Sequence, residues 1–93
     1  MFTPKELKYI AQELDKKILK DGSEIEAYAY NYGIEVKVVN KHYTKITDNE
    51  TQKVYFEFLI KKNGDIKYPK LKKEDIDRFI EATNISGDII ANL

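Results

Sequence analysis

The chain has 93 residues, of which 42% are apolar and 34% charged, and its formal net charge is zero. These values are typical of one soluble globular domain and exclude two domains or a disordered chain. No segment approaches the ~20 apolar residues of a membrane-spanning helix, and the N-terminus lacks signal-peptide features. The absence of cysteine excludes disulfides, thiolate catalysis and cysteine-type zinc sites, so we expect a cytoplasmic protein.

The basic residues are almost all lysines, with Arg78 as the one arginine. Together with the many isoleucines, asparagines and tyrosines, this bias indicates an AT-rich genome, such as that of a low-GC bacterium or its phage. The balanced charge argues against a dedicated sequence-independent nucleic-acid binder, which usually carries a clear basic excess.

The N-terminal part predicts a helix followed by a strand. Thr3 can cap a helix over residues 4–20, because Pro4 suits its first position and Glu6 completes a capping box. Gly22 is expected to end this helix. Residues 24–32 then alternate as a strand, with a turn at Asn31-Tyr32-Gly33.

Three further strands are expected at residues 34–43, 53–61 and 65–68. The polar stretch 47–51 is predicted to be a loop, and Asn63-Gly64 is a strong signal for a type I′ turn.

A second helix is predicted to begin near Lys72 and to end at Asn84 or Gly87, with Ile76, Phe79 and Ile80 on its buried face. The tail 88–93 is expected to form a last helical turn or to cover the edge of the core.

The expected fold is therefore a single α+β domain over residues 1–93, ordered α-β-β-β-β-α, with a four-stranded antiparallel sheet and both helices on one face. The predicted core is Leu7, Ile10, Leu14, Ile18, Ile25, Ala27, Ala29, Val36, Val38, Val54, Phe56, Phe58, Ile60, Ile66, Ile76, Phe79 and Ile80.

A row of tyrosines on the uncovered sheet face is the strongest functional signal. If Ile25, Ala27 and Ala29 face the helices, the alternation turns the intervening tyrosines towards solvent. Apolar and aromatic side chains ringed by mixed charge are typical of a protein interface. The expected partner-binding residues are Tyr28, Tyr30, Tyr32, Tyr55, Glu57, Leu59 and Lys61. Two other interpretations stay open: the tyrosines only stabilise the sheet through cross-strand pairs, or the strand is inverted and they face the helices.

Nucleic-acid binding is the alternative function for the same tyrosines, because aromatic side chains on a sheet can stack on bases. The accompanying phosphate contacts would be Lys62, Lys67, Lys70, Lys72 and Lys73. However, four glutamates lie on or beside that face and would repel phosphates: Glu24, Glu26, Glu35 and Glu57. Lysines in such a run also form a solvated face or protect an edge strand.

Catalysis and metal binding have little support. His42 is the only histidine, and Ser23 and Ser86 lie in expected turns without a recognisable motif. The acidic residues around Asp75 suit the first turn of a helix. We therefore expect neither an enzyme nor a metal or small-molecule cofactor.

The sequence thus favours a small non-enzymatic protein-binding module. Small cysteine-free chains of AT-rich composition are common among phage and mobile-element inhibitors of host proteins, including anti-CRISPR proteins, which makes a host protein the first expected partner. A homodimer through the tyrosine face or an edge strand is a further possibility. No membrane partner is expected.

Overall fold

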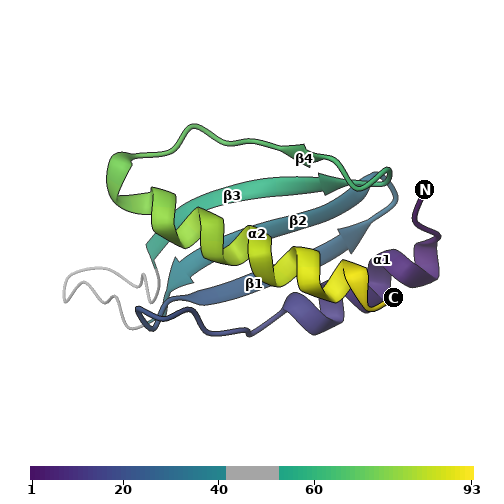
Figure 1. Ribbon diagram of the computed structural model, residues 1–93, viewed down its shortest axis with the longest axis horizontal. Coiled ribbons are helices and arrows are strands. Elements are labelled where there is room, and N and C mark those ends of the chain that lie inside the picture. The colour runs from purple at the N-terminus through teal and green to yellow at the C-terminus, as the bar shows by residue number, and fades with distance from the viewer. Residues whose placement is uncertain (42–52) are drawn as a thin grey trace.

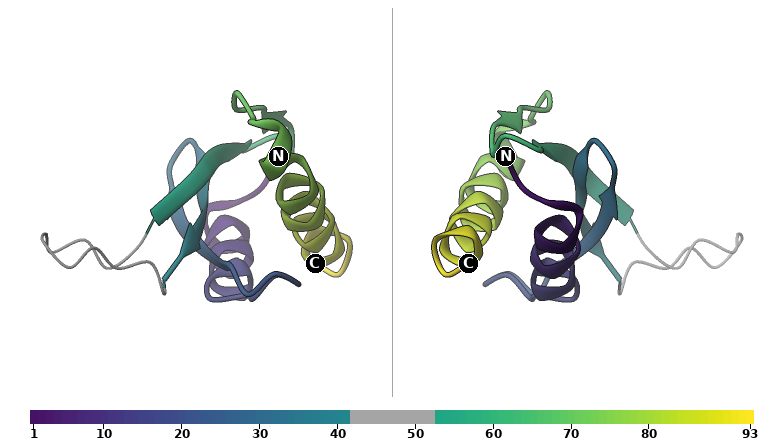
Figure 2. Two further views of the ribbon diagram at one scale, coloured as in Figure 1. Left: turned by 90° about the vertical axis from the view of Figure 1, so that its left-hand side faces the viewer. Right: turned by 90° about the vertical axis from the view of Figure 1, so that its right-hand side faces the viewer.

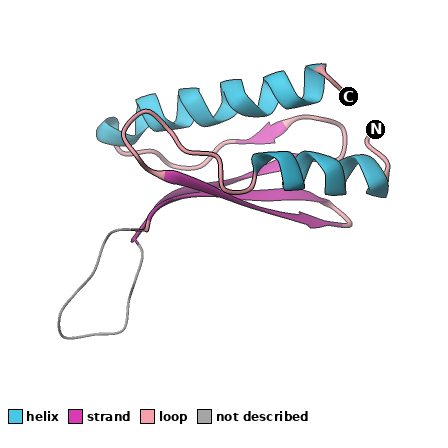
Figure 3. Cartoon of the chain, turned by 90° about the horizontal axis from the view of Figure 1, so that it is seen from below, coloured by secondary structure: helices cyan, strands magenta, loops and turns pink. Residues whose placement is uncertain are grey.

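A meander of four antiparallel strands forms one layer of the structure, and two helices form the other. The structure is a computed structural model that describes residues 1–41 and 53–93. The elements are α1 (Pro4–Leu14), β1 (Glu24–Tyr30), β2 (Gly33–Asn40), β3 (Lys53–Lys61), β4 (Ile66–Lys67), the short 3₁₀ helix η1 (Lys73–Asp75) and α2 (Ile76–Ala91). The strand order is β1-β2-β3-β4 (Figure 1). Both helices lie on the same face of the sheet (Figures 2 and 3), which confirms the predicted architecture.

Helix α1 begins as predicted but ends six residues early. The Thr3 hydroxyl accepts a hydrogen bond from the Glu6 amide, and the Glu6 carboxylate accepts one from the Thr3 amide, which completes the capping box. The predicted end at residue 20 is wrong, because Lys16 adopts a positive φ of 71° and reverses the chain. Lys16 and Lys17 then pair with the backbone of Ile25 at the start of β1.

This reversal changes which residue after α1 enters the core. The segment that follows Lys16 is extended, and Ile18 forms an isolated bridge with Glu24. Ile18 is 59% exposed, whereas Leu19 is buried. The prediction of Ile18 as a core residue is therefore wrong, because it extended the helical period beyond the end of the helix.

Gly33 allows β1, β2 and β3 to lie side by side at the β1–β2 turn. It has a φ of 150°, and a Cβ atom at this position would lie 2.2 Å from the carbonyl oxygen of Ile60 in β3. No side chain fits into such an approach. Strand β1 ends at Tyr30, two residues before the predicted boundary. Strand β2 ends at Asn40, so its predicted continuation is wrong at Lys41. The remainder of that continuation, residues 42–43 with His42, and the predicted loop 47–51 lie outside the described residues.

The β3–β4 connection turns at the predicted place but with another geometry. The Gly64 amide donates to the Lys61 carbonyl, and Gly64 has a φ of 91°. A type I′ turn needs a positive φ at both central residues, and Asn63 does not have one. The type I′ prediction is therefore wrong, and β4 is only two residues long.

Helix α2 is longer than predicted and buries a different face. It continues through Asn84 and Gly87 to Ala91, so the tail predicted for residues 88–93 is mostly helix. The buried residues of this helix are Phe79, Ala82 and Ser86. Ile76 and Ile80 were predicted to be buried, but both are exposed.

The core lies between the sheet and the helices, and its aromatic centre explains the orientation of α2. The Phe79 ring packs edge-on against Phe56 and Phe58, with centroids 5.8 Å and 5.3 Å apart. This contact fixes Phe79 inward and turns Ile80 outward. Ala29 and Val54 were also predicted to be buried but are exposed, and Ile66 is partly buried. The buried apolar residues missing from the predicted core are Ala11, Leu19, Ile34, Val39 and Ala82.

Candidate interaction surface

The tyrosine row of β1 and the following turn lies on the sheet face opposite the helices. Ile25 and Ala27 are buried in the core, and the exposed fractions of Tyr28, Tyr30 and Tyr32 are 46%, 44% and 52%. The alternative of an inverted β1 is therefore wrong. We define the open face as the solvent-facing side of the sheet that carries these three tyrosines.

Two of these tyrosines form an ordered pair at the β1–β2 turn. The rings of Tyr30 and Tyr32 stack with centroids 5.3 Å apart and an angle of 3° between their planes. The Tyr32 hydroxyl donates a hydrogen bond to the Glu35 carboxylate. This hydrogen bond, with smaller effects of burial and of the Glu35 charge, raises the pKa of Tyr32 to about 12. The phenol of Tyr32 is therefore held neutral and oriented.

Opposite charges alternate across the remainder of the open face. Lys37 in β2 lies opposite Glu26 in β1 and Glu57 in β3, and its ammonium is 6.0 Å from the centroid of the Tyr28 ring. Lys41 forms ion pairs with Glu24 at 2.8 Å and Glu26 at 3.6 Å. The open face therefore combines aromatic rings with both signs of charge.

A shallow hollow of about 330 Å³ adjoins the tyrosine row on the β3 side. Leu59 is half-buried there, and the predicted residue Glu57 also lines the hollow. The other lining residues are Tyr32, Glu35, Phe58, Lys67 and Tyr68. Lys61 is exposed opposite Gly33, which has no side chain. The structure thus brings six of the seven predicted partner-binding residues to the open face: Tyr28, Tyr30, Tyr32, Glu57, Leu59 and Lys61.

Tyr55 does not join this group, because β3 bulges beside it. The register shifts between Val38 and Val39, which pair with Phe56 and Val54, so Tyr55 is the extra residue of the bulge. Its ring packs against the core, and the guanidinium of Arg78 from α2 lies 3.9 Å from the ring centroid. Tyr55 therefore contacts the helical layer rather than the open face.

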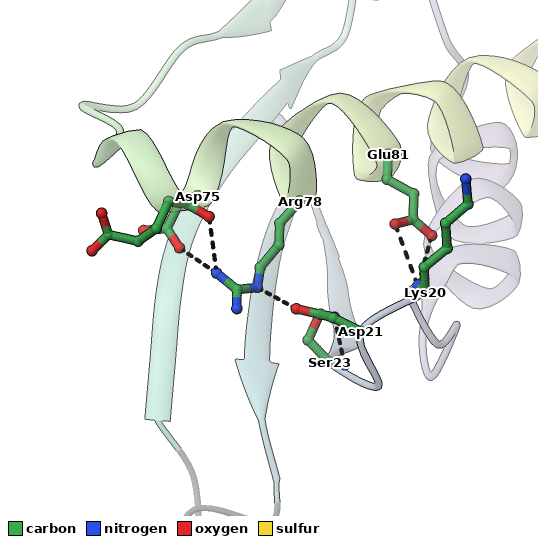
Figure 4. Close-up of polar contacts among 7 residues, drawn as sticks. Lys20, Asp21, Ser23, Asp75, Arg78 and Glu81 are labelled. Carbon is green, nitrogen blue, oxygen red and sulfur yellow. Dashed lines mark hydrogen bonds and ion pairs between the residues drawn. The ribbon is translucent and has the colours of Figure 1, made fainter.

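Arg78 is the centre of a polar network that the sequence analysis did not identify. It donates to Asp21 at 2.5 Å and to the buried Asp75 at 2.8 Å, as Figure 4 shows. Burial raises the pKa of Asp21, but hydrogen bonds from Ser23 and the charge of Arg78 outweigh this effect and leave the pKa below its ordinary value. The sequence feature that could have indicated this network is the single arginine among many lysines.

A second contact beside this network also joins α2 to the segment between α1 and β1. The Glu81 carboxylate accepts a hydrogen bond from the Lys20 amide at 3.0 Å. Both sets of contacts hold the helical layer together and lie away from the open face, so we assign them a structural role.

The five lysines proposed for phosphate contacts do not gather on one patch. Lys62 lies in the β3–β4 turn, Lys67 in β4 and Lys73 in η1, while Lys70 and Lys72 lie in the connection between them. Figure 1 shows the β3–β4 turn and the start of α2 at opposite ends of the molecule. These lysines therefore follow the length of the fold.

Within residues 1–41 and 53–93, no group of three or more histidine, cysteine, aspartate or glutamate side chains could hold a metal ion. No helix in that part of the chain is both long and apolar enough to cross a bilayer. Comparisons of the chain with protein-family models, curated proteins and solved structures found no match.

Proposed function

We propose that this protein is a non-enzymatic module that binds another protein through the open face. The observation that carries the proposal is the row formed by Tyr28, Tyr30 and Tyr32, each about half exposed on a sheet face that neither helix covers. Tyrosine is enriched among the residues that dominate binding energies, because it buries a large ring and offers a polar hydroxyl. The half-buried Leu59 extends this aromatic surface towards β3.

The charges of the open face favour a protein partner over a nucleic acid. Glu26, Glu35 and Glu57 lie among the tyrosines, where they would repel phosphates, and the lysines of this face alternate with them instead of forming a continuous basic groove. Single-strand binders usually combine stacking rings with a continuous basic groove. The alternating charges instead suit a protein surface whose own charges alternate.

In this proposal the protein acts by covering a surface of its partner with the open face. A host protein of a low-GC bacterium is the proposed target, and the proposed role is that of an inhibitor from a phage or mobile element acting in the cytoplasm. A second copy of the chain is the competing occupant of the same face, and the oligomeric state of the purified protein distinguishes the two.

The experiment is an affinity pull-down from a low-GC bacterial lysate, with and without nuclease, using the wild type and two matched variants. Tyr30→Ala removes an open-face ring, and Tyr9→Ala removes an equally exposed tyrosine from α1. We expect the wild type to capture a protein band that survives nuclease treatment. Tyr30→Ala should weaken this band more than about fivefold, which corresponds to a loss of ~1 kcal/mol in binding free energy, whereas Tyr9→Ala should leave it unchanged. Loss of the band after nuclease treatment, or equal capture by all three proteins, would contradict the proposal.

A further inference from the structure

The outer edge of β1 carries backbone hydrogen-bonding groups that the proposed function does not use. β1 is an edge strand of the sheet. At its start, the outward N–H and C=O of Ile25 pair with Lys17 and Lys16, and the Ala27 amide donates to the Asp15 carboxylate at 3.1 Å. Outward-facing residues alternate along an antiparallel strand, so both backbone groups of Ala29 also point outward.

These groups of Ala29 have no hydrogen-bond partner within the described ranges 1–41 and 53–93. Nor does the short side chain of Ala29 shield them, since this residue is exposed. Exposed edge groups of this kind are where an extended peptide can add a strand to a sheet.

A groove of about 620 Å³ lies directly beside this edge. One wall is α1 with the adjoining Asp15, the other is the segment 27–31, and Lys62 lines it as well. Leu7, Ala11 and Ala27 are the buried apolar residues of its lining, and the other lining residues are exposed or partly exposed. At about 3.3 Å per residue, the segment 27–31 matches four to five residues of an extended chain.

The walls and charges of the groove indicate which occupant fits. Because α1 forms one wall, the space suits a single extended segment better than a second copy of the sheet with its own α1. Lys8 and Lys62 supply two positive charges to the lining, whereas Asp15 supplies one negative charge and already accepts the Ala27 amide. A negatively charged side chain on the segment would therefore be favoured.

We propose that this groove binds an extended acidic segment of a partner protein, which adds a short strand to β1 through the backbone of Ala29. The backbone bonds would provide the attachment, and an acidic side chain near Lys8 or Lys62 would select the segment. Tyr28 and Tyr30 line this groove as well as the open face. The proposal nevertheless rests on the edge groups of Ala29 and does not require the open face to bind.

The first test uses two capped seven-residue peptides as probes, one of alternating valine and glutamate and one of alternating valine and lysine. Hydrogen exchange of the full-length protein, followed by NMR, reports on each backbone amide. We expect the glutamate peptide to slow exchange of the Ala29 amide at least tenfold and to bind more tightly than the lysine peptide. Unchanged Ala29 exchange with saturating glutamate peptide would overturn the proposal.

Two sets of variants test the contacts separately. Ala29→Pro removes the edge amide and should abolish peptide binding, whereas Ala29→Ser keeps the amide and should bind within threefold of the wild type. If Ala29→Pro fails to fold, the double variant Lys8→Glu/Lys62→Glu still tests the proposal. It should bind the lysine peptide more tightly than the glutamate peptide, which reverses the preference of the wild type. An unchanged preference in a folded double variant would contradict the acidic specificity.

Discussion

At the scale of single residues, Arg78 and Tyr32 show how one side chain fixes its surroundings. Arg78 connects α2 to the segment after α1 through Asp21, neutralises the buried carboxylate of Asp75 and covers the ring of Tyr55. Tyr32, in the β1–β2 turn, stacks on Tyr30 of β1 and donates a hydrogen bond to Glu35 of β2, so it connects the two strands. Neither contact follows from sequence spacing alone, because each depends on side-chain directions that the fold sets.

Replacing Arg78 should destabilise the protein more than replacing another basic residue nearby. Arg78→Ala leaves the buried carboxylate of Asp75 without its cation, which we expect to lower the free energy of unfolding by about 2–3 kcal/mol. The exposed Lys73→Ala should change it by less than about 0.5 kcal/mol. Urea denaturation measures both, and an equal effect of the two variants would show that the network contributes little.

The Tyr32–Glu35 hydrogen bond should be visible in the titration of the tyrosines. One phenol should ionise with a pKa of about 12, because the hydrogen bond to Glu35 favours its protonated form. This folded-state pKa lies above the unfolded value near 10, so the stabilisation is present below about pH 10 and is lost as the pH rises through 12. Ultraviolet absorbance of tyrosinate follows the ionisation, and Glu35→Ala should lower this pKa. An unchanged titration in Glu35→Ala would contradict the assignment.

At the scale of elements, the sequence predicted the existence and order of helices and strands better than their ends. The capping box at Thr3 and the alternation from Phe56 to Ile60 in β3 are local signals, and both predictions are confirmed. The end of α1 depends on the pairing of Lys16 and Lys17 with β1, which is a tertiary contact. The same holds for the buried face of α2, since the aromatic contacts of Phe79 with β3 override the apolar pattern of Ile76 and Ile80.

Two glycines should respond in opposite ways to the same substitution. Gly87 lies inside α2 with nothing within 4 Å of an added Cβ atom, so Gly87→Ala should raise the free energy of unfolding by about 0.5–1 kcal/mol. Gly33→Ala would place its Cβ against the Ile60 carbonyl and should lower it by about 2 kcal/mol or more. Thermal or urea unfolding measures both changes. A destabilising Gly87→Ala would contradict a helix that continues to Ala91.

At the scale of the whole molecule, the open face follows from the placement of both helices on one side of the sheet. Period-2 alternation predicted that the tyrosines of β1 lie on the side facing solvent, and their exposure in the structure confirms this. Alternation failed at Tyr55, because the bulge beside Val38 shifts the period of β3 by one residue. The groove at the β1 edge could not be predicted either, since it depends on how α1 lies against that strand.

The most direct measurement for the binding role of the open face is hydroxyl-radical footprinting of the protein with and without the partner captured in the pull-down. Oxidation of Tyr28, Tyr30 and Tyr32 should fall several-fold in the complex, because an occluded ring loses its contact with solvent. Tyr9 on α1, which is equally exposed in the free protein, should be oxidised to the same extent in both states. Unchanged oxidation of the three tyrosines, or protection of Tyr9 instead, would contradict binding through the open face.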